Sequence, residues 1–187
     1  MSTAAKLIFL CGKMAAGKST LARDLAEREN AILLVQDQFL DSLYPGEITD
    51  IPGFVKCSSR LKNALEPHVC ALLAKGISVV LDFPGNTKAQ RAWFRGIFER
   101  ANVEHELHFV DASDSLCKSQ LKDRSQNLPP GTPWTRMRSS KPSLCTFSLH
   151  QGMKDSTSSV MSAPNNTLEL PPNRYALGSP RVARPGR

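Results

Sequence analysis

The stretch Gly12–Ser19 combines two glycines, a lysine and a serine at the spacing G-x-x-x-x-G-K-S. Glycine at both positions allows a tight turn whose backbone N–H groups point at an anion. An apolar run precedes the stretch and a helical sequence follows it, which is the context in which this pattern binds nucleotide phosphates. There the Lys18 ammonium would reach the β- and γ-phosphates, and the Ser19 hydroxyl would bind Mg²⁺. The alternative is a chance glycine-rich turn. We expect nucleotide contacts from Gly12, Lys13, Met14, Ala15, Ala16, Gly17, Lys18, Ser19 and Thr20, the last at the α-phosphate.

Two carboxylates follow apolar runs further along the chain. Asp82 ends the run VVLD, and the carboxyl ends of buried strands are where open α/β sheets bind ligands. It could hold Mg²⁺ through water, or it could be an ordinary turn aspartate before Pro84. Asp37 ends the run AILLVQD in the same way. It could accept a proton from a hydroxyl that attacks the γ-phosphate, or it could cap a following helix.

Basic residues suggest how an acceptor and the phosphates could be held. Arg60, close to Lys56 in FVKCSSRLK, could bind an anionic acceptor by a charge-assisted pair, or it could lie on a solvated helix face. Arg124 precedes a loop rich in proline and glycine and could close over the phosphates as a lid, or it could end a solvated helix. The guanine-recognition pattern N-K-x-D does not occur, because NTKA at Asn86 has the wrong order, so ATP is favoured over GTP.

The elements that would position these residues alternate in type. Apolar runs predict four strands at Lys6–Cys11, Ala31–Asp37, Ile77–Phe83 and His105–Asp111. Helical patterns separate and follow them at Lys18–Glu29, Ser59–Gly76, Thr87–Ala101 and Ser115–Gln126, with Pro67 expected to bend or restart the second helix and Thr87 to cap the third. Strands that are apolar throughout and alternate with helices indicate an α/β fold, with a parallel sheet covered by helices on both faces.

The formal charge of +7 is concentrated at the end of the chain. Residues 1–135 carry 16 basic and 15 acidic side chains, whereas residues 136–187 carry eight basic and two acidic ones. The tail has few aromatic residues and no helical stripe, so nucleic-acid binding is the least favoured function. Five widely spaced cysteines without a C-x-x-C pattern argue against a disulfide framework and a zinc site. With no signal peptide or membrane span in sight, we expect a cytoplasmic protein.

Several segments carry a family resemblance. LIFLCGKMAAGKSTLA, VKCSSRLKNALEPHV, VVLDFPGNTKAQRAWFRGIFE and LPPGTPW resemble the small bacterial P-loop proteins classed as AAA-family ATPases, which are kinase-like and related to zeta toxins, polynucleotide kinases and chloramphenicol phosphotransferase. The resemblance covers Lys6 to Thr135. It implies a sheet in the order 2-3-1-4-5, binding of ATP and Mg²⁺, and phosphoryl transfer to a small-molecule or nucleotide hydroxyl. A weak ATPase or nucleotide-dependent switch that acts through protein contacts is the alternative.

The same resemblance assigns roles to individual residues. It implies that Gly12, Gly17, Lys18 and Ser19 bind the nucleotide and that Asp37 is the base on the acceptor side. Arg60 would be the substrate arginine and Arg124 the lid residue, while Asp82 and Asn86 would lie in the segment that faces the acceptor.

The tail, residues 136–187, departs from the family pattern. Allowed codons for Thr135 to Asn165, read one nucleotide earlier, can encode TDAEFEAITVYFQPPSGDEGFNVIRYERA followed by a stop. This reading supplies the acidic and aromatic segment and the strand-like FNVIR that the family pattern contains. We therefore hypothesise an out-of-frame, disordered tail after a domain of residues 1–135; a genuine disordered basic tail is the alternative. The hypothesis predicts that the fifth strand is missing and that the fourth strand is an open sheet edge, which favours aggregation and weakens the fold and its activity.

Overall fold

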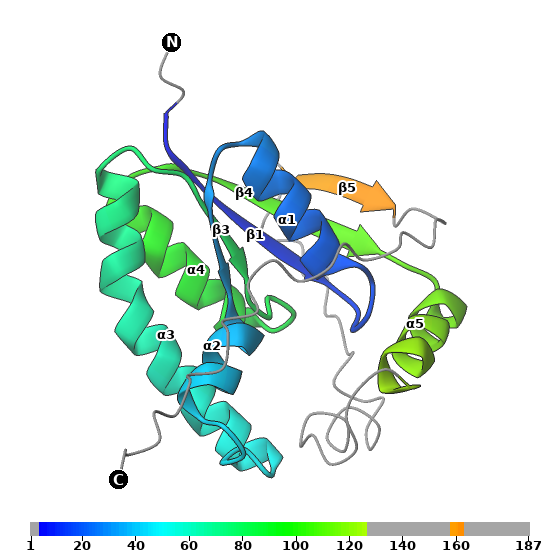
Figure 1. Cartoon of the computed structure of the whole chain (residues 1–187). Helices are drawn as coiled ribbons and strands as arrows, with labels where there is room; N and C mark the ends of the chain where they lie inside the picture. Colours follow the sequence, from blue (N-terminus) through cyan, green and yellow to red (C-terminus); the bar gives the residue numbers. More distant parts are fainter. Residues whose placement is uncertain (1–3, 127–157, 163–187) are drawn as a thin grey trace, which may run out of the picture.

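A parallel sheet with helices on both faces forms the centre of the molecule (Figure 1). The structure is a computed structural model, and it describes residues 4–126 and 158–162. Along the chain the elements are β1 (Lys6–Gly12), α1 (Lys18–Arg28), β2 (Ile32–Val35), α2 (Gln36–Leu43), α3 (Ile51–Ala74), β3 (Val79–Asp82), α4 (Lys88–Ala101), β4 (Glu104–Asp111), α5 (Asp114–Gln126) and β5 (Ser158–Ser162).

The strand order is β2-β3-β1-β4-β5, and every neighbouring pair is parallel, which confirms the expected order. β1 lies between β3 and β4, so that Leu7 has Val79 on one side and His105 on the other. All parallel strands end at the same edge, so the phosphate loop after β1 lies beside the end of β3, and the end of β2 follows on the far side of β3.

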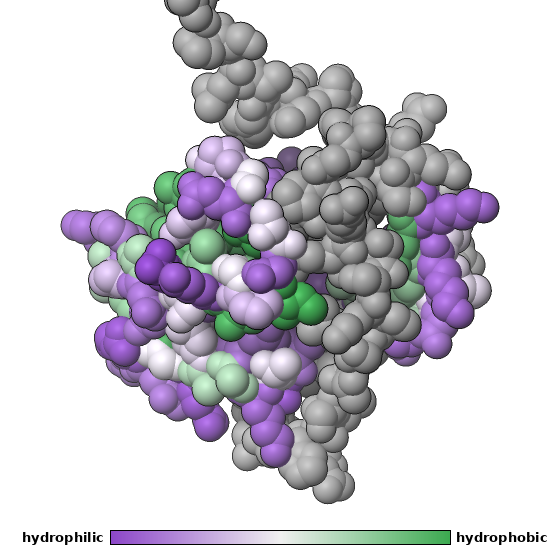
Figure 2. All heavy atoms as spheres, turned by 90° about the horizontal axis from the view of Figure 1, so that it is seen from below, coloured by the Kyte–Doolittle hydropathy of each residue, from purple (hydrophilic) through white to green (hydrophobic). Residues whose placement is uncertain are grey.

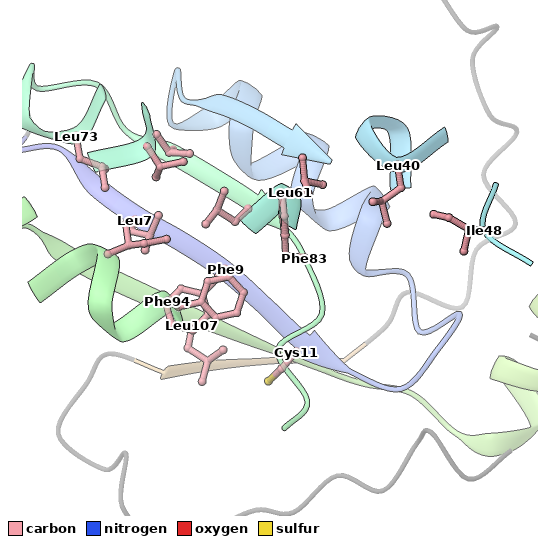
Figure 3. Packing of buried hydrophobic residues seen from close by; sticks show 14 residues of the cluster. Leu7, Phe9, Cys11, Leu40, Ile48, Leu61, Leu73, Phe83, Phe94 and Leu107 are labelled. Atoms are coloured by element: carbon pink, nitrogen blue, oxygen red, sulfur yellow. The ribbon is translucent and has the colours of Figure 1, made fainter. Parts of the chain in front are cut away.

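Helices bury the two faces of the sheet separately. On one face, Leu7 and Phe9 of β1 belong to a core shared with α2, α3 and α4. Figure 3 shows this core, in which the rings of Phe9 and Phe94 stack with their centroids 4.4 Å apart. On the other face, Ile8 and Leu10 pack with residues of α1 and with Cys117 of α5. Because β1 is buried on both faces, its apolar run has no alternation.

The fifth position of the sheet is occupied, so the expectation of a missing strand is wrong. β5 pairs in parallel with β4, from Leu107 opposite Ser158 to Asp111 opposite Ser162. The edge of β4 presents backbone N–H and C=O groups, and these pair with any extended segment in register, whatever its side chains. The rest of segment 136–187 lies outside the described residues, and the division at residue 135 stays a prediction.

Two helices differ from the expected pattern, and a third begins where it was expected. α2 was not predicted; it begins directly after β2, which ends at Val35 rather than at Asp37. α3 begins well before the expected Ser59, because Asp50 caps it by accepting from Gly53 N at 2.7 Å, and it continues through Pro67 without restarting. α4 begins as expected at the Thr87 cap, where Thr87 and Gln90 form a reciprocal capping box.

Among the helices of the described residues, none is long and apolar enough to cross a bilayer.

Candidate active site

The phosphate loop takes its shape from three left-handed or glycine-specific backbone positions. Gly12, at the end of β1, has φ +138°, Ala15 has φ +57°, and Gly17, which caps α1, has φ +92°. No side chain bonds to the Gly17 cap, and no acidic residue lies in the first turn of α1. Within the described residues, no capping side chain or acidic residue of α1 therefore competes with an anion for the positive end of the α1 dipole.

Lys18 is held over the loop by the loop itself. Its Nζ donates to the carbonyl oxygens of Gly12 at 2.9 Å and Lys13 at 2.6 Å. The Lys13 side chain turns the other way, where its Nζ bonds to Asp114 at 2.6 Å and to the Ala112 carbonyl at 3.2 Å. The Lys18 contacts hold an ammonium where phosphate oxygens are expected, and the Lys13 contacts connect the loop to the start of α5.

The expected nucleotide-binding residues follow the loop as the pattern requires. Gly12, Ala15 and Ala16 are buried, and the remaining expected nucleotide-binding residues are half-buried, namely Lys13, Met14, Gly17, Lys18, Ser19 and Thr20. Thr20 N bonds to Gly17 O at 3.1 Å, which places Thr20 in the first turn of α1.

Ser19 lies close to Asp82 at the end of β3, near enough for its hydroxyl to affect the pKa of Asp82. Burial raises the pKa of Asp82 above its ordinary value; the Ser19 hydroxyl bond and the Lys18 charge act against this rise, and the nearby Asp37 carboxylate adds to it. A hydroxyl and a carboxylate are hard oxygen donors of the kind that Mg²⁺ takes, and Mg²⁺ usually completes its shell with phosphates and water. Ser19 and Asp82 therefore fit this cation. Within the described residues no group of three His, Cys, Asp or Glu side chains could hold a metal.

Asp37 lies in the first turn of α2 and is half-buried. Val35 is the cap of that helix, so the alternative of Asp37 as an N-cap does not hold. The Asp37 carboxylate is close enough to Asp82 to raise the pKa of that residue. The ends of β2 and β3 and the loop that carries Lys18 therefore form one site.

Asn86 contacts the phosphate loop directly. Its Oδ1 accepts a hydrogen bond from Gly12 N at 3.0 Å. The Arg91 guanidinium donates to the carbonyl oxygens of Gly85 at 3.2 Å and Asn86 at 3.0 Å. Sequence reasoning missed Arg91; its place in the first turns of the helix that follows the Asn86 loop is the only signal that could have found it.

The acceptor side is only partly assembled from the expected residues. Arg60 and Lys56 are exposed on α3. Next to them, the buried Ser58 donates to Gln36 Oε1 at 3.0 Å, which ties α3 to the residue before Asp37. Arg124 lies within α5, but its side chain is outside the described residues.

Other features of the helices were not expected. Lys62 lies over the Trp93 ring, with Nζ 5.3 Å from the centroid, and burial lowers its pKa. The exposed apolar side chains of Leu43 and Val55 come from α2 and the first turns of α3, which lie lowest in Figure 1. Figure 2, which looks at the molecule from below, shows hydrophobic residues interleaved with hydrophilic ones on that face.

The parallel order, the loop after β1 and the carboxylates at the strand ends define a P-loop NTPase of the kinase-like class. Residues 7–140 match the family AAA_33, described as an AAA domain, and the chain belongs to this family. No curated protein matches the sequence.

Three solved structures with the same fold carry descriptions as kinases. A protein from Chloroflexus aurantiacus, provisionally described as a kinase, is 20% identical with a TM-score of 0.56 over 65% of this chain and 66% of that chain. A sugar kinase from Janibacter is 14% identical with a TM-score of 0.56 over 85% and 86%. The Mycobacterium tuberculosis APS kinase CysC, in complex with AMPPNP and APS, is 19% identical with a TM-score of 0.54 over 87% and 90%. At these identities the likeness concerns the fold.

Proposed function

We propose that the chain binds ATP with Mg²⁺ and transfers the γ-phosphoryl group to a hydroxyl of a small molecule or a nucleotide. The observation that carries this proposal is the convergence of Lys18, Ser19, Asp82 and Asp37 at the carboxyl edge of the sheet. The kinase-like fold, and the AMPPNP held by the related APS kinase, support ATP as the phosphate donor.

The residues divide the reaction between them. The backbone N–H groups of the loop and the Lys18 ammonium bind and orient the phosphates, and they stabilise the charge that develops on the transferred group. Ser19 and Asp82 would hold Mg²⁺, which would supply positive charge against the phosphates. Asp37 accepts the hydroxyl proton while the acceptor oxygen bonds to the γ-phosphorus, and the bond to the β–γ bridging oxygen breaks, leaving ADP.

Further residues complete the proposal. Arg60 contacts an anionic acceptor, and Arg124 closes over the phosphates. We also propose a cytoplasmic protein, because no disulfide joins the cysteines of the described residues, as in proteins of reducing compartments. The proposal includes neither a membrane nor a nucleic-acid partner.

The test follows γ-labelled phosphate from ATP into a panel of sugars, nucleosides and other hydroxyl compounds. Transfer should depend on the acceptor, stop when Mg²⁺ is chelated and fall at least a hundredfold in Lys18→Ala and Asp37→Asn. Asp41→Asn is the matched control, because Asp41 lies one turn further along α2 and is exposed. Release of inorganic phosphate at a rate that no acceptor changes would instead support the weak ATPase or switch.

A further inference from the structure

The short loop between β3 and α4 contacts the first glycine of the phosphate loop. Gly12 N can only donate a hydrogen bond, so the Asn86 amide must present its oxygen to it, and the two atoms lie 3.0 Å apart. This contact joins residues far apart in the sequence and fixes which side of the Asn86 amide faces the loop.

Gly12 has little room to move away from this contact. A Cβ at Gly12 would lie 2.4 Å from the carbonyl oxygen of Val110, because the backbone of β4 packs directly against it. The carbonyl oxygen of Gly12 in turn accepts from Lys18 Nζ at 2.9 Å. One residue therefore connects Asn86, through its N–H, to Lys18, through its C=O.

The backbone around Asn86 is also held by hydrogen bonds and close packing. Arg91 donates to the carbonyl oxygens of both Gly85 and Asn86. Gly85 is packed against β1, since a Cβ there would lie 2.9 Å from Leu10 O. The capping box that begins α4 fixes the residue that follows Asn86. The loop therefore has few alternative conformations in which Asn86 could leave Gly12.

We propose that Asn86, held by Arg91, is a positioning residue that sets the Lys18 ammonium through Gly12. This inference rests on the proposed function, because it concerns the residue that would bind the transferred phosphate. Without the Asn86 oxygen, the Gly12 N–H loses its acceptor, and the loop relaxes until that N–H finds another. Lys18 then moves with the Gly12 carbonyl, and a small displacement of a charged group costs much of its effect on a transition state.

A role for Asn86 in contacting the acceptor would leave a different kinetic signature. Loss of an acceptor contact raises the KM for the acceptor and leaves acceptor-independent ATP hydrolysis unchanged. Loss of Lys18 positioning lowers kcat for hydrolysis and for transfer together, with a smaller change in nucleotide affinity.

The experiment compares Asn86→Leu, which keeps the shape but removes the acceptor atom, with Asn86→Asp, which keeps an acceptor oxygen. Arg91→Lys weakens the support of the loop. Arg95→Gln is the matched control on the same helix, where Arg95 is 63% exposed and pairs with Glu99 of that helix. Hydrogen exchange at the Gly12 amide, followed by NMR without nucleotide, reports the contact independently of any activity.

Exchange at Gly12 should accelerate about tenfold or more in Asn86→Leu, by less in Arg91→Lys, and not in Asn86→Asp or Arg95→Gln. The kcat for ATP turnover should fall about ten- to a hundredfold in Asn86→Leu. If that variant does not fold, the Arg91→Lys results decide. Unchanged Gly12 exchange, or a change confined to the KM of the acceptor, would overturn the inference. Wild-type protein that hydrolyses ATP in an Asn86-dependent manner but phosphorylates no acceptor would disprove the proposed transfer and leave this inference standing.

Discussion

Replacing Gly12 by alanine should destabilise the protein far more than the same change at Gly17. Both residues have positive φ, +138° and +92°, so alanine is strained at either position. At Gly12 the new Cβ would also lie 2.4 Å from Val110 O, a backbone atom that cannot turn aside, whereas no atom of the described residues lies within 4 Å of a Cβ at Gly17.

The two costs can be estimated separately. Backbone strain in a region that L residues rarely adopt costs of order 1–3 kcal/mol, and forcing extra atoms into a packed site costs about 1–3 kcal/mol more. Gly12→Ala should therefore lose about 2–6 kcal/mol, and Gly17→Ala about 1–3 kcal/mol. Gly96 lies within α4, and in the described part of the chain no atom comes within 4 Å of a Cβ there, so Gly96→Ala should gain about 0.5–1 kcal/mol.

Urea unfolding followed by circular dichroism measures the three free energies, and titration with ATP measures binding. Gly17→Ala should remain folded but bind ATP more weakly, because Gly17 begins the helix whose N–H groups face the phosphates. Equal losses of stability in Gly12→Ala and Gly17→Ala would refute the reasoning, because they would mean that the contact between β1 and β4 at Val110 contributes nothing.

Further changes test single features of the structure. Burial raises the pKa of Asp82, so ionisation of this carboxyl above its ordinary pKa opposes folding. The stability of Asp82→Asn relative to wild type should therefore be greater at pH 8 than at pH 4, while Mg²⁺-dependent ATP binding is lost. An equal difference in the free energy of urea unfolding at both pH values would exclude this cause. Thr87→Ala removes the capping box and should cost about 1 kcal/mol by the same unfolding assay; no loss would mean that the cap is not formed in solution. Burial raises the pKa of Cys11 to about 11. Iodoacetamide at pH 8 should therefore label Cys57 in the folded protein and Cys11 only after unfolding, which peptide mass spectrometry measures. Labelling of Cys11 in the folded protein would argue against its burial. A chain with residues 136–164 replaced by the neighbouring-frame sequence should unfold at a higher urea concentration. Its FNVIR segment lies at nearly the same distance from Thr135 as β5 and favours pairing with β4 more than Ser158–Ser162 does. An unchanged midpoint of unfolding would count against the frame hypothesis.

The sequence predicted those features that depend on short-range pattern. The loop Gly12–Ser19 and the apolar strands beside it are encoded by spacing and composition within a dozen residues. The family resemblance supplied the strand order, which no local pattern contains. Thr87 was recognisable as a cap because a hydroxyl residue directly precedes the α4 pattern.

The missed features depend on contacts between distant segments. The bond between Asn86 and Gly12 joins two loops that only the sheet brings together. α2 has eight residues and begins without a side-chain cap at Val35, so the apolar run of β2 conceals where the strand ends. β5 was expected to be missing because the tail was interpreted as out of frame, yet the backbone edge of β4 pairs with it.

The central claim is that the loop between β1 and α1 binds ATP with Mg²⁺, and calorimetric titration of ATP tests it most directly. The full chain should bind one ATP with Mg²⁺ present and bind it much more weakly after chelation. Lys18→Ala, with an unchanged circular dichroism spectrum, should lose most of the affinity. Folded wild-type protein that binds no ATP, or that binds it as tightly as Lys18→Ala does, would contradict the claim.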